Sequence, residues 1–386
     1  MKIAIVHDQL REFGGAERVL VVLKEIYPQA DVFTSTFDLN SLGEHKEIVK
    51  HWNVHVSWFG KIPLLNRLYS PLRFLTPLIW ESFDFSKYDL VISSTGSWMC
   101  KGIVTKKPTI HISYIHHPPR YLYGYETAVE WQKHLIIKIY GVFINHFLRL
   151  WDYEASQKPD HLIANSIETQ KRITKFYRRD STVIYPPVNV PSQSVISNVE
   201  RNLAKRDYFI TVSRLARAKH VDLLIKAANK YHFNLKVVGV GRDMKYLQSI
   251  AGLTIEFLGN VSDKKLKDLY QNAKAFLFAS IDEEFGIAPV EAMGFGLPVI
   301  AYASGGLKET VHEDVNGYLF QEQSEKSLEV AMKKLQSLSD EKYLDMRKYA
   351  RKESEKYSEE VFKKKIIQLV NSKLLIGHSR EDGNPC

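Results

Sequence analysis

Two glutamates, Glu283 and Glu291, flank a glycine-containing segment in the sequence EEFGIAPVEAM. The segment follows AFLFAS, a short apolar stretch that is typical of a buried strand. Pro289 suits the first turn of a helix, which predicts that residues 285–287 lead into a helix N-terminus and that Glu291 lies in its first turn. Acids near a helix start are favourable for electrostatic reasons alone. The pair around a glycine loop nevertheless favours a polyhydroxyl ligand, held by carboxylates and free backbone N–H groups.

A second pair of charged residues, Arg214 and Lys219, follows the apolar stretch YFITVS. Arginine can bind phosphate through a forked contact and lysine through a point charge, so the two cations suit a diphosphate. The alternative is a solvated basic turn that precedes a helix. Either interpretation places both residues just beyond the end of a strand.

Two glycine motifs could bring a ligand close to the backbone. Gly239 and Gly241 end a predicted strand in VVGVGRD, but the third glycine of a dinucleotide-binding motif is absent. Gly14 and Gly15 begin a predicted helix in FGGAERVL, where free N–H groups could meet phosphate. A simple helix-entry turn would explain the second motif equally well.

His116 and His117 follow another predicted strand in SYIHHPPRYLY and could contact a reacting group. A structural histidine is the alternative. His51 and His55 have a helical spacing, but HWNVHVSW is typical of a strand and no cysteine or acid cluster accompanies them. The sequence therefore predicts no metal site.

The elements that position these residues alternate between short apolar strands and longer helical patterns. Most of the strands are continuously apolar, as expected for parallel strands covered on both faces. Two such series predict an α/β protein with two doubly wound domains, and a ligand cleft between them beyond the carboxyl ends of the strands. The expected strands are 2–6, 89–93, 109–115, 161–165 and 182–186 in the first series, and 208–213, 234–239, 254–259, 275–280 and 298–302 in the second.

The boundary between the two series is rich in serine, asparagine and proline. We expect a first domain over 1–190, a linker over 191–206 and a second domain over 207–355. The pattern after it predicts a C-terminal helix over 356–375. The final residues, 376–386, are expected to be disordered.

The chain of 386 residues is 45% apolar and 25% charged and has a formal charge of +9, which suits acidic partners. No motif for nucleic-acid binding appears. Two cysteines and the short apolar start predict a cytoplasmic protein. The segment 58–79 contains Lys61, Arg67 and Arg73 among leucines and aromatic residues, without an acid. It would suit the anionic inner face of the cell membrane, or an insertion packed on its own domain.

The motifs together resemble the retaining family 4 glycosyltransferases, which have the GT-B fold of two Rossmann-like domains. The resemblance extends from GGAERVL to NGYLF, and its most specific element is the pair Glu283 and Glu291. The phrases YIHHPPRYLY, WDYEASQKPDHLIANS, VIYPPVN and EEFGIAPVEAM are similar to GDP-mannose-dependent mannosyltransferases that build bacterial O-antigens and other surface polysaccharides.

The resemblance implies roles for the segment after AFLFAS. Glu283 would hold hydroxyls of the donor sugar, and Glu291 would hold the ribose of the nucleotide. The backbone of Phe285, Gly286 and Ile287 would bind the donor sugar and the diphosphate. Where the family often has Asp or Gly, this chain has a second acid directly after Glu283, so either of the two could face the sugar.

The resemblance also implies a metal-independent reaction without a cofactor. Arg214 and Lys219 would stabilise the departing diphosphate, and Gly15 would contact it when the cleft closes. The C-terminal helix would cross back to the first domain.

By the same resemblance, His116 would orient the transferred sugar, although His117 could compete for this role. Gly239 and Gly241 would border the base. The implied activity moves mannose or a similar hexose from a GDP-sugar to a glycan acceptor on a polyprenyl carrier, with retention. The alternatives are a UDP-sugar donor, or a non-catalytic nucleotide-sugar-binding scaffold on the same fold.

Overall fold

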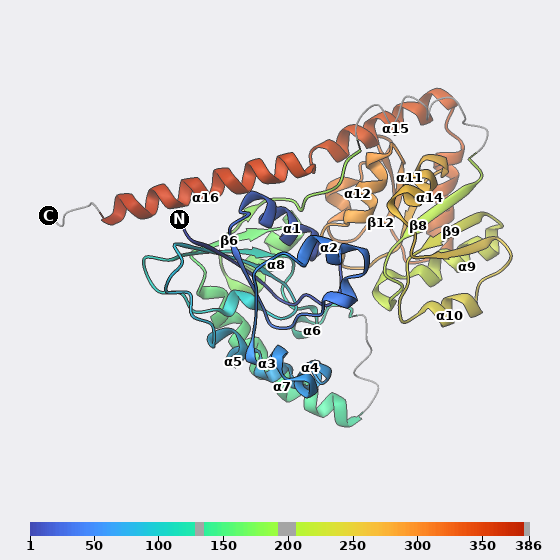
Figure 1. Ribbon diagram of the computed structural model, residues 1–386. Helices are drawn as coiled ribbons and strands as arrows, with labels where there is room; N and C mark the ends of the chain where they lie inside the picture. The colour runs from blue at the N-terminus through green and yellow to red at the C-terminus, as the bar shows by residue number, and fades with distance from the viewer. Residues whose placement is uncertain (128–134, 192–205, 382–386) are drawn as a thin grey trace. The chain divides into compact units, whose positions relative to one another are not determined.

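The structure is a computed structural model that describes residues 1–127, 135–191 and 206–381 (Figure 1). The chain divides into two compact units. The first unit contains Met1–Tyr125, Glu130–Pro187 and Glu360–Cys386. The second contains Glu126–Val129 and Val188–Glu359. The residues expected to form the linker lie almost entirely outside the described part.

The first unit is built on a parallel sheet of seven strands in the order β3-β2-β1-β4-β5-β6-β7. The five strands expected in this half are present, and the strand expected around His55 is β3. The short strand β2 was not predicted. The bounds are β1 Ile3–His7, β2 Asp31–Thr34, β3 Val54–Val56, β4 Leu90–Thr95, β5 Ile110–Ile115, β6 His161–Ala164 and β7 Thr182–Val183.

Apolar helix faces cover this sheet. In α1 (Gly15–Ile26), Val19, Leu20 and Leu23 are buried, as their spacing predicts. Ser166 caps α8 (Ile167–Tyr177), because its hydroxyl accepts the backbone N–H of Thr169. The other helices of this unit are α2 Lys46–Val49, α3 Trp58–Lys61, α4 Pro63–Arg67, α5 Thr76–Glu81, α6 Arg120–Tyr123 and α7 Leu135–Gln157.

The second unit has a parallel sheet of six strands in the order β10-β9-β8-β11-β12-β13. Its five predicted strands are present, and β13 is additional. The bounds are β8 Tyr208–Val212, β9 Asn234–Val238, β10 Ile255–Gly259, β11 Phe276–Phe278, β12 Val299–Tyr302 and β13 Gly317–Phe320. The helices are α9 Val221–Tyr231, α10 Met244–Ser249, α11 Asp263–Asn272, α12 Ile287–Gly294, α13 Leu307–Thr310, α14 Glu325–Gln336 and α15 Asp340–Glu355.

Both sheets reverse their strand order beside their first strand, between β1 and β4 and between β8 and β11. In an open parallel sheet, ligands bind beyond the carboxyl ends of the strands at such a reversal. In each unit, the candidate residues should therefore lie near the ends of the two strands at the reversal.

The long C-terminal helix α16 spans Glu359–Glu381 (Figure 1). Phe362, Ile366 and Val370 are buried in the core of the first unit, so a late segment of the chain completes an early domain. The structure describes α16 as far as Glu381, and the expected disorder over 376–386 stays a prediction. No helix in the described part of the chain is long and apolar enough to cross a membrane.

Candidate active site

In the second unit, Glu283 lies in the loop between β11 and α12. Gly286 precedes the helix with φ of 87°, a conformation that favours glycine, so the segment does lead into a helix N-terminus as predicted. Pro289 is in the first turn of α12. Glu291 is not, because the helix begins at Ile287 and Glu291 is its fifth residue. That expectation is corrected: Glu291 lies in the second turn.

The carboxylate of Glu283 forms an ion pair with Lys219. The distance from Lys219 Nζ to Glu283 Oε2 is 2.5 Å, and the Ser280 hydroxyl donates to the same oxygen at 2.8 Å. The two charged side chains are 24% and 15% exposed. Lys219 and Glu283 come from different loops, and the structure brings them together at the carboxyl ends of β8 and β11. This contact identifies Glu283 as the acid that meets the predicted phosphate-binding lysine.

Two further glycines, Gly305 and Gly306, shape the Glu283 loop. The N–H of Gly306 donates to the carbonyl oxygen of Glu283 at 2.8 Å. A Cβ atom on Gly305 would lie 2.0 Å from that same oxygen, and one on Gly306 would lie 2.3 Å from the carbonyl oxygen of Glu284. Only glycine permits this approach, so the turn after β12 supports the loop after β11. The sequence signal was the Gly-Gly pair directly after a buried strand.

Gly239 and Gly241 allow two segments of the protein backbone to lie close together. Gly239 has φ of 121°, and a Cβ atom there would lie 2.0 Å from the carbonyl oxygen of Ser213. A Cβ atom on Gly241 would lie 2.1 Å from the carbonyl oxygen of Leu215. The two glycines therefore pack the loop after β9 against the segment that carries Arg214. Arg214 is exposed there.

In the first unit, Gly15 is the first residue of α1. A carboxylate of the protein already contacts this helix start, because Glu17 Oε2 accepts the N–H of Gly14 at 2.9 Å. The other carboxylate oxygen of Glu17 lies 3.4 Å from His7 Nε2. Glu17 thus connects the helix start to the end of β1.

His116 lies at the end of β5 and contacts the adjacent strand end. Its Nε2 atom is 2.7 Å from the Ser94 hydroxyl, which is also 3.1 Å from His7 Nδ1. His7, Ser94 and His116 are all buried. Sequence reasoning selected His116 but missed His7 and Ser94, whose signal was a polar residue at or next to the last position of a buried strand.

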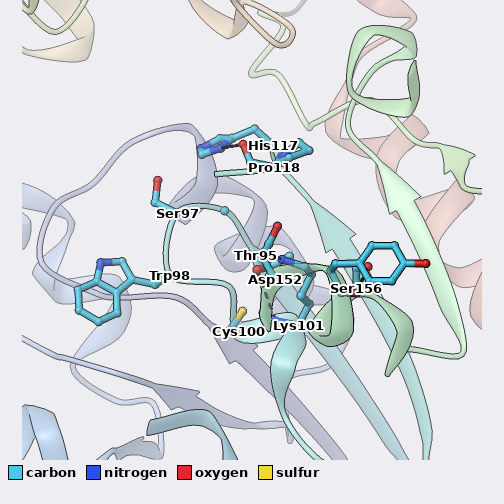
Figure 2. A network of polar contacts seen from close by, with 12 residues as sticks. Thr95, Ser97, Trp98, Cys100, Lys101, His117, Pro118, Asp152 and Ser156 are labelled. Atoms are coloured by element: carbon cyan, nitrogen blue, oxygen red, sulfur yellow. Dashed lines mark hydrogen bonds and ion pairs between the residues drawn. The ribbon is translucent and has the colours of Figure 1, made fainter. Parts of the chain in front are cut away.

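His117 lies over the loop that follows β4 (Figure 2). Its Nδ1 atom is 3.0 Å from the carbonyl oxygen of Pro118, and a Cβ atom on Gly96 would lie 3.2 Å from its Nε2 atom. Beneath it, the buried carboxylate of Asp8 accepts backbone N–H groups of Gly96 and Trp98 at 2.7 and 2.8 Å. The two adjacent histidines therefore have different surroundings: His116 contacts buried side chains and His117 contacts a loop.

A buried ion pair anchors the segment after these histidines. Lys101 pairs with Asp152 of α7, and the hydroxyl of Tyr123 donates to the second Asp152 oxygen at 2.7 Å (Figure 2). Burial, followed by Asp152, raises the pKa of Tyr123 well above its ordinary value. The loop after β4, α6 and α7 are thus joined by one polar cluster that the sequence did not reveal.

Within the described ranges, no group of three or more histidine, cysteine or acidic side chains has an arrangement that could hold a metal ion. The clusters instead combine carboxylates, an ammonium group, imidazoles and a helix N-terminus. Such groups can bind phosphate and hydroxyl groups.

Comparison with known proteins agrees with the two-unit architecture. Residues 13–192 match the family described as Glycosyltransferase Family 4, and residues 193–353 match Glycosyl transferases group 1. The alpha-1,3/1,6-mannosyltransferase ALG2 of Candida glabrata is 25% identical over 81% of this chain and 78% of that protein. The mouse (Mus musculus) GDP-Man:Man(3)GlcNAc(2)-PP-Dol alpha-1,2-mannosyltransferase is 23% identical over 93% of this chain and 84% of that protein.

Among solved structures, Anabaena Alr3699/HepE in complex with UDP and glucose has a similar fold, with a TM-score of 0.67 and 21% identity. The match covers 96% of this chain and 100% of that one. The two adjoining family matches span almost all of both units, and the sheets have the strand order that the fold requires. The chain belongs to the family 4 glycosyltransferases and has the GT-B fold.

Proposed function

We propose that this glycosyltransferase moves mannose from GDP-mannose to a glycan acceptor, with retention of the anomeric configuration. The observation that carries the proposal is the cluster of Lys219, Glu283 and Ser280 beside the N-terminus of α12. It sets a cation, a carboxylate and a helix N-terminus at one strand reversal. A nucleoside diphosphate sugar needs those three kinds of group.

In the proposed reaction, the bond between the anomeric carbon and the phosphate oxygen breaks, and the diphosphate leaves with the electron pair. Arg214, Lys219 and the helix N-terminus would stabilise the developing charge without a metal. Glu283 would bind hydroxyls of the donor sugar and Glu291 the ribose. The acceptor hydroxyl would attack from the side that the diphosphate leaves, and the diphosphate would take its proton.

The donor and acceptor are supported by the names of relatives. The similar Candida protein is named a mannosyltransferase, and the mouse protein is named for GDP-Man and a PP-Dol-linked glycan. A polyprenyl-linked acceptor is therefore our preferred acceptor class. A UDP-sugar is the alternative donor, because the similar Anabaena structure contains UDP and glucose.

An acceptor in a membrane would require contact with lipid, and the first unit has a surface that suits it. We define the α7 patch as the exposed residues Ile139, Val142, Phe143, Phe147 and Leu150. Exposed Lys138 and Arg149 adjoin it on the same helix. Basic residues beside exposed apolar side chains favour binding to anionic lipid.

The segment 58–79, the other candidate for membrane contact, is partly buried and partly exposed. Phe59 and Ile79 of this segment are buried in the first unit, as the packed-insertion interpretation requires. Arg73 does not reach outward, because its guanidinium lies 4.2 Å from the ring centroid of Tyr121. Leu64 and Leu68 remain exposed and could extend the α7 patch.

Thermal unfolding with GDP, UDP, ADP and their sugars, each with magnesium or with EDTA, tests the proposal. We expect GDP and GDP-mannose to raise the melting temperature by several degrees, equally in both media, since a ligand at a hundred times its Kd stabilises by about 2.7 kcal/mol. A preference for UDP would overturn the donor. No response to any nucleotide would overturn the proposed donor site.

A further inference from the structure

A cavity of about 480 Å³ lies in the first unit, where α6, α7 and the last turn of α8 meet. Its walls include Tyr121 and Tyr123 of α6, Asn145 and Arg149 of α7, and Phe176 of α8. A volume of this size is typical of a site for a small ligand. The cluster that we assign to the nucleotide belongs to the second unit, so it does not account for this cavity.

Contacts within the protein fix the walls of the cavity. The ring of Tyr123 stacks on Phe176 with the ring centroids 4.0 Å apart, and its hydroxyl donates to Asp152 at 2.7 Å. The side-chain amide of Asn145 donates to the carbonyl oxygen of Tyr121 at 3.4 Å, which joins α7 to α6. The shape of the cavity therefore does not depend on a ligand, as is usual for small-molecule sites.

Arg149 gives the cavity a positive charge. Burial and Asp152 raise the pKa of Tyr123, and the positive charge of Arg149 partly opposes them, so the guanidinium lies within electrostatic reach of the Tyr123 hydroxyl. Asp152, which lies behind Tyr123, is neutralised by its ion pair with Lys101. Among the residues that the structure describes, no acid lines the cavity. The cavity is therefore suited to an anion, and arginine can bind a phosphate through a forked contact.

An apolar surface adjoins the cavity. Val142 lines the cavity and also belongs to the α7 patch. Val142, Asn145 and Arg149 are three and four residues apart, so they lie on one side of α7. Phe143 and Leu150 each follow one of these residues directly, which places the apolar stripe beside the cavity. A ligand with a phosphate in the cavity would thus have an apolar surface next to it.

We propose that this cavity binds the phosphate end of a polyprenyl diphosphate-linked acceptor, with Arg149 as a phosphate ligand, and that the polyprenyl chain lies on the α7 patch. The inference rests on the proposed function, which supplies the acceptor class, and adds the site that holds this acceptor. A cation beside exposed apolar side chains matches both parts of such an amphiphile. A free anion would use only the cavity, and an uncharged lipid would use only the patch.

The cavity is connected to a candidate residue for the sugar-binding part of the first unit. The hydroxyl of Tyr121 donates to the carbonyl oxygen of Ser97 at 3.3 Å. Ser97 belongs to the loop after β4, over which His117 lies (Figure 2). The phosphate of the acceptor and the sugar to be extended would therefore bind to adjoining parts of this unit.

Binding to vesicles distinguishes the acceptor from an anionic membrane in general. Zwitterionic vesicles contain either polyprenyl diphosphate or phosphatidylglycerol, matched for total charge, and cosedimentation measures the binding. We expect the unmodified protein to bind the polyprenyl diphosphate vesicles about tenfold more tightly, and Arg149→Gln to lose this preference, since a charge-assisted contact is lost. Equal binding of the unmodified protein to both kinds of vesicle would overturn the proposal and assign the surface to anionic lipid.

Two further variants control for total charge and for folding. Lys352→Gln removes an exposed cation from α15 of the second unit and should keep the preference. Arg149→Lys keeps the charge without the fork and should keep part of it. Arg149 is exposed, so its variants should fold, and thermal unfolding checks this. A similar loss in Arg149→Gln and Lys352→Gln would show that net charge alone decides the binding, which contradicts the proposal.

Titration with GDP separates this inference from the proposed function. If no nucleotide binds, yet the preference for polyprenyl diphosphate depends on Arg149, the cavity proposal stands and the donor proposal fails. If GDP binds and the two kinds of vesicle are not distinguished, the cavity proposal fails and the donor proposal stands. A preference that persists unchanged in Arg149→Gln would support the acceptor class but overturn the site.

Discussion

Lys219 and Glu283 neutralise each other in the second unit, so a diphosphate that binds there must compete for the ammonium group. Both side chains are only partly exposed, which strengthens their attraction relative to a pair in open water. The contact keeps Lys219 extended toward the end of β11 before any ligand arrives. Glu283 therefore has two functions in our interpretation: it positions a phosphate-binding cation and it binds sugar hydroxyls.

Separate substitutions of these two residues should affect different steps. Lys219→Ala should weaken nucleoside diphosphate binding about tenfold or more, because a charge-assisted contact is lost. Glu283→Ala should abolish transfer while the affinity for the nucleotide stays nearly intact, since the released lysine remains available to phosphate. Calorimetric titration of the nucleotide and a transfer assay measure the two effects.

Glu329→Ala is the control for these variants, because Glu329 also pairs with a lysine, Lys333, but on the surface helix α14. It should change neither quantity. Loss of nucleotide affinity in Glu283→Ala as large as in Lys219→Ala would contradict the division of roles. Unchanged turnover in Glu283→Ala would show that the sugar binds elsewhere.

At the scale of secondary-structure elements, β5 contains a histidine that is fully buried. The pKa of His111 is lowered from 6.5 to about 3, first by burial and then by the positive charges of Arg179 and Lys158. Its Nε2 atom contacts the Ser93 hydroxyl at 2.9 Å. The imidazole is thus neutral in the folded strand and becomes protonated in the unfolded chain below about pH 6.5.

This difference in pKa predicts that the protein loses stability in acid. Between pH 6.5 and about 3 the unfolded state binds a proton that the folded state does not, so the free energy of unfolding falls as the pH falls. From 6.5 to about 5 the loss approaches roughly 2 kcal/mol, at about 1.4 kcal/mol for each pH unit. Denaturant unfolding of the protein and of His111→Gln across this range measures it.

The variant should have a smaller pH slope than the unmodified protein. His146→Gln, at an exposed position on α7, makes the same chemical change and should leave the slope as it is. The prediction fails if His111→Gln and His146→Gln have the same slope.

The strands of this protein were largely predictable because they are continuous apolar runs at parallel-sheet positions. The two that were missed, β2 and β13, are four residues long, and β2 mixes polar with apolar residues in DVFT. The position of Glu283 in the site was predictable because the strand, loop and helix start around it are consecutive in the sequence. The partners Lys219–Glu283 and Ser94–His116 could not be paired from sequence, since strand order brings them together. Glu17, whose carboxylate contacts His7, looked like an ordinary first-turn helix residue.

At the scale of the whole molecule, helix α7 of the first unit carries a group of exposed apolar side chains. Phe143 is 73% exposed and Phe147 is 50% exposed. Exposed apolar side chains that lie together are unfavourable in water, which indicates that another surface covers them when the protein functions. Exposed cations nearby give the surface an affinity for anionic headgroups. The α7 patch is therefore the place to test contact with lipid.

The double variant Phe143→Ser/Phe147→Ser should bind vesicles of mixed anionic and zwitterionic lipid at least about tenfold more weakly, because two aromatic rings no longer leave water. Cosedimentation with vesicles measures the binding. The control is Val330→Ser/Tyr349→Ser, which removes exposed apolar side chains from α14 and α15. Equal binding by the two double variants and the unmodified protein would remove the lipid proposal.

The placement of α16 also sets the order in which a ribosome can complete the two units. The first unit needs Phe362, Ile366 and Val370 to cover its core, and these are translated only after the whole of the second unit. During synthesis, domains usually fold one after another from the N-terminus. Here the later domain can finish first, while the earlier one has an uncovered apolar face until its last helix emerges. That interval is the time at which the nascent chain most needs protection by a chaperone.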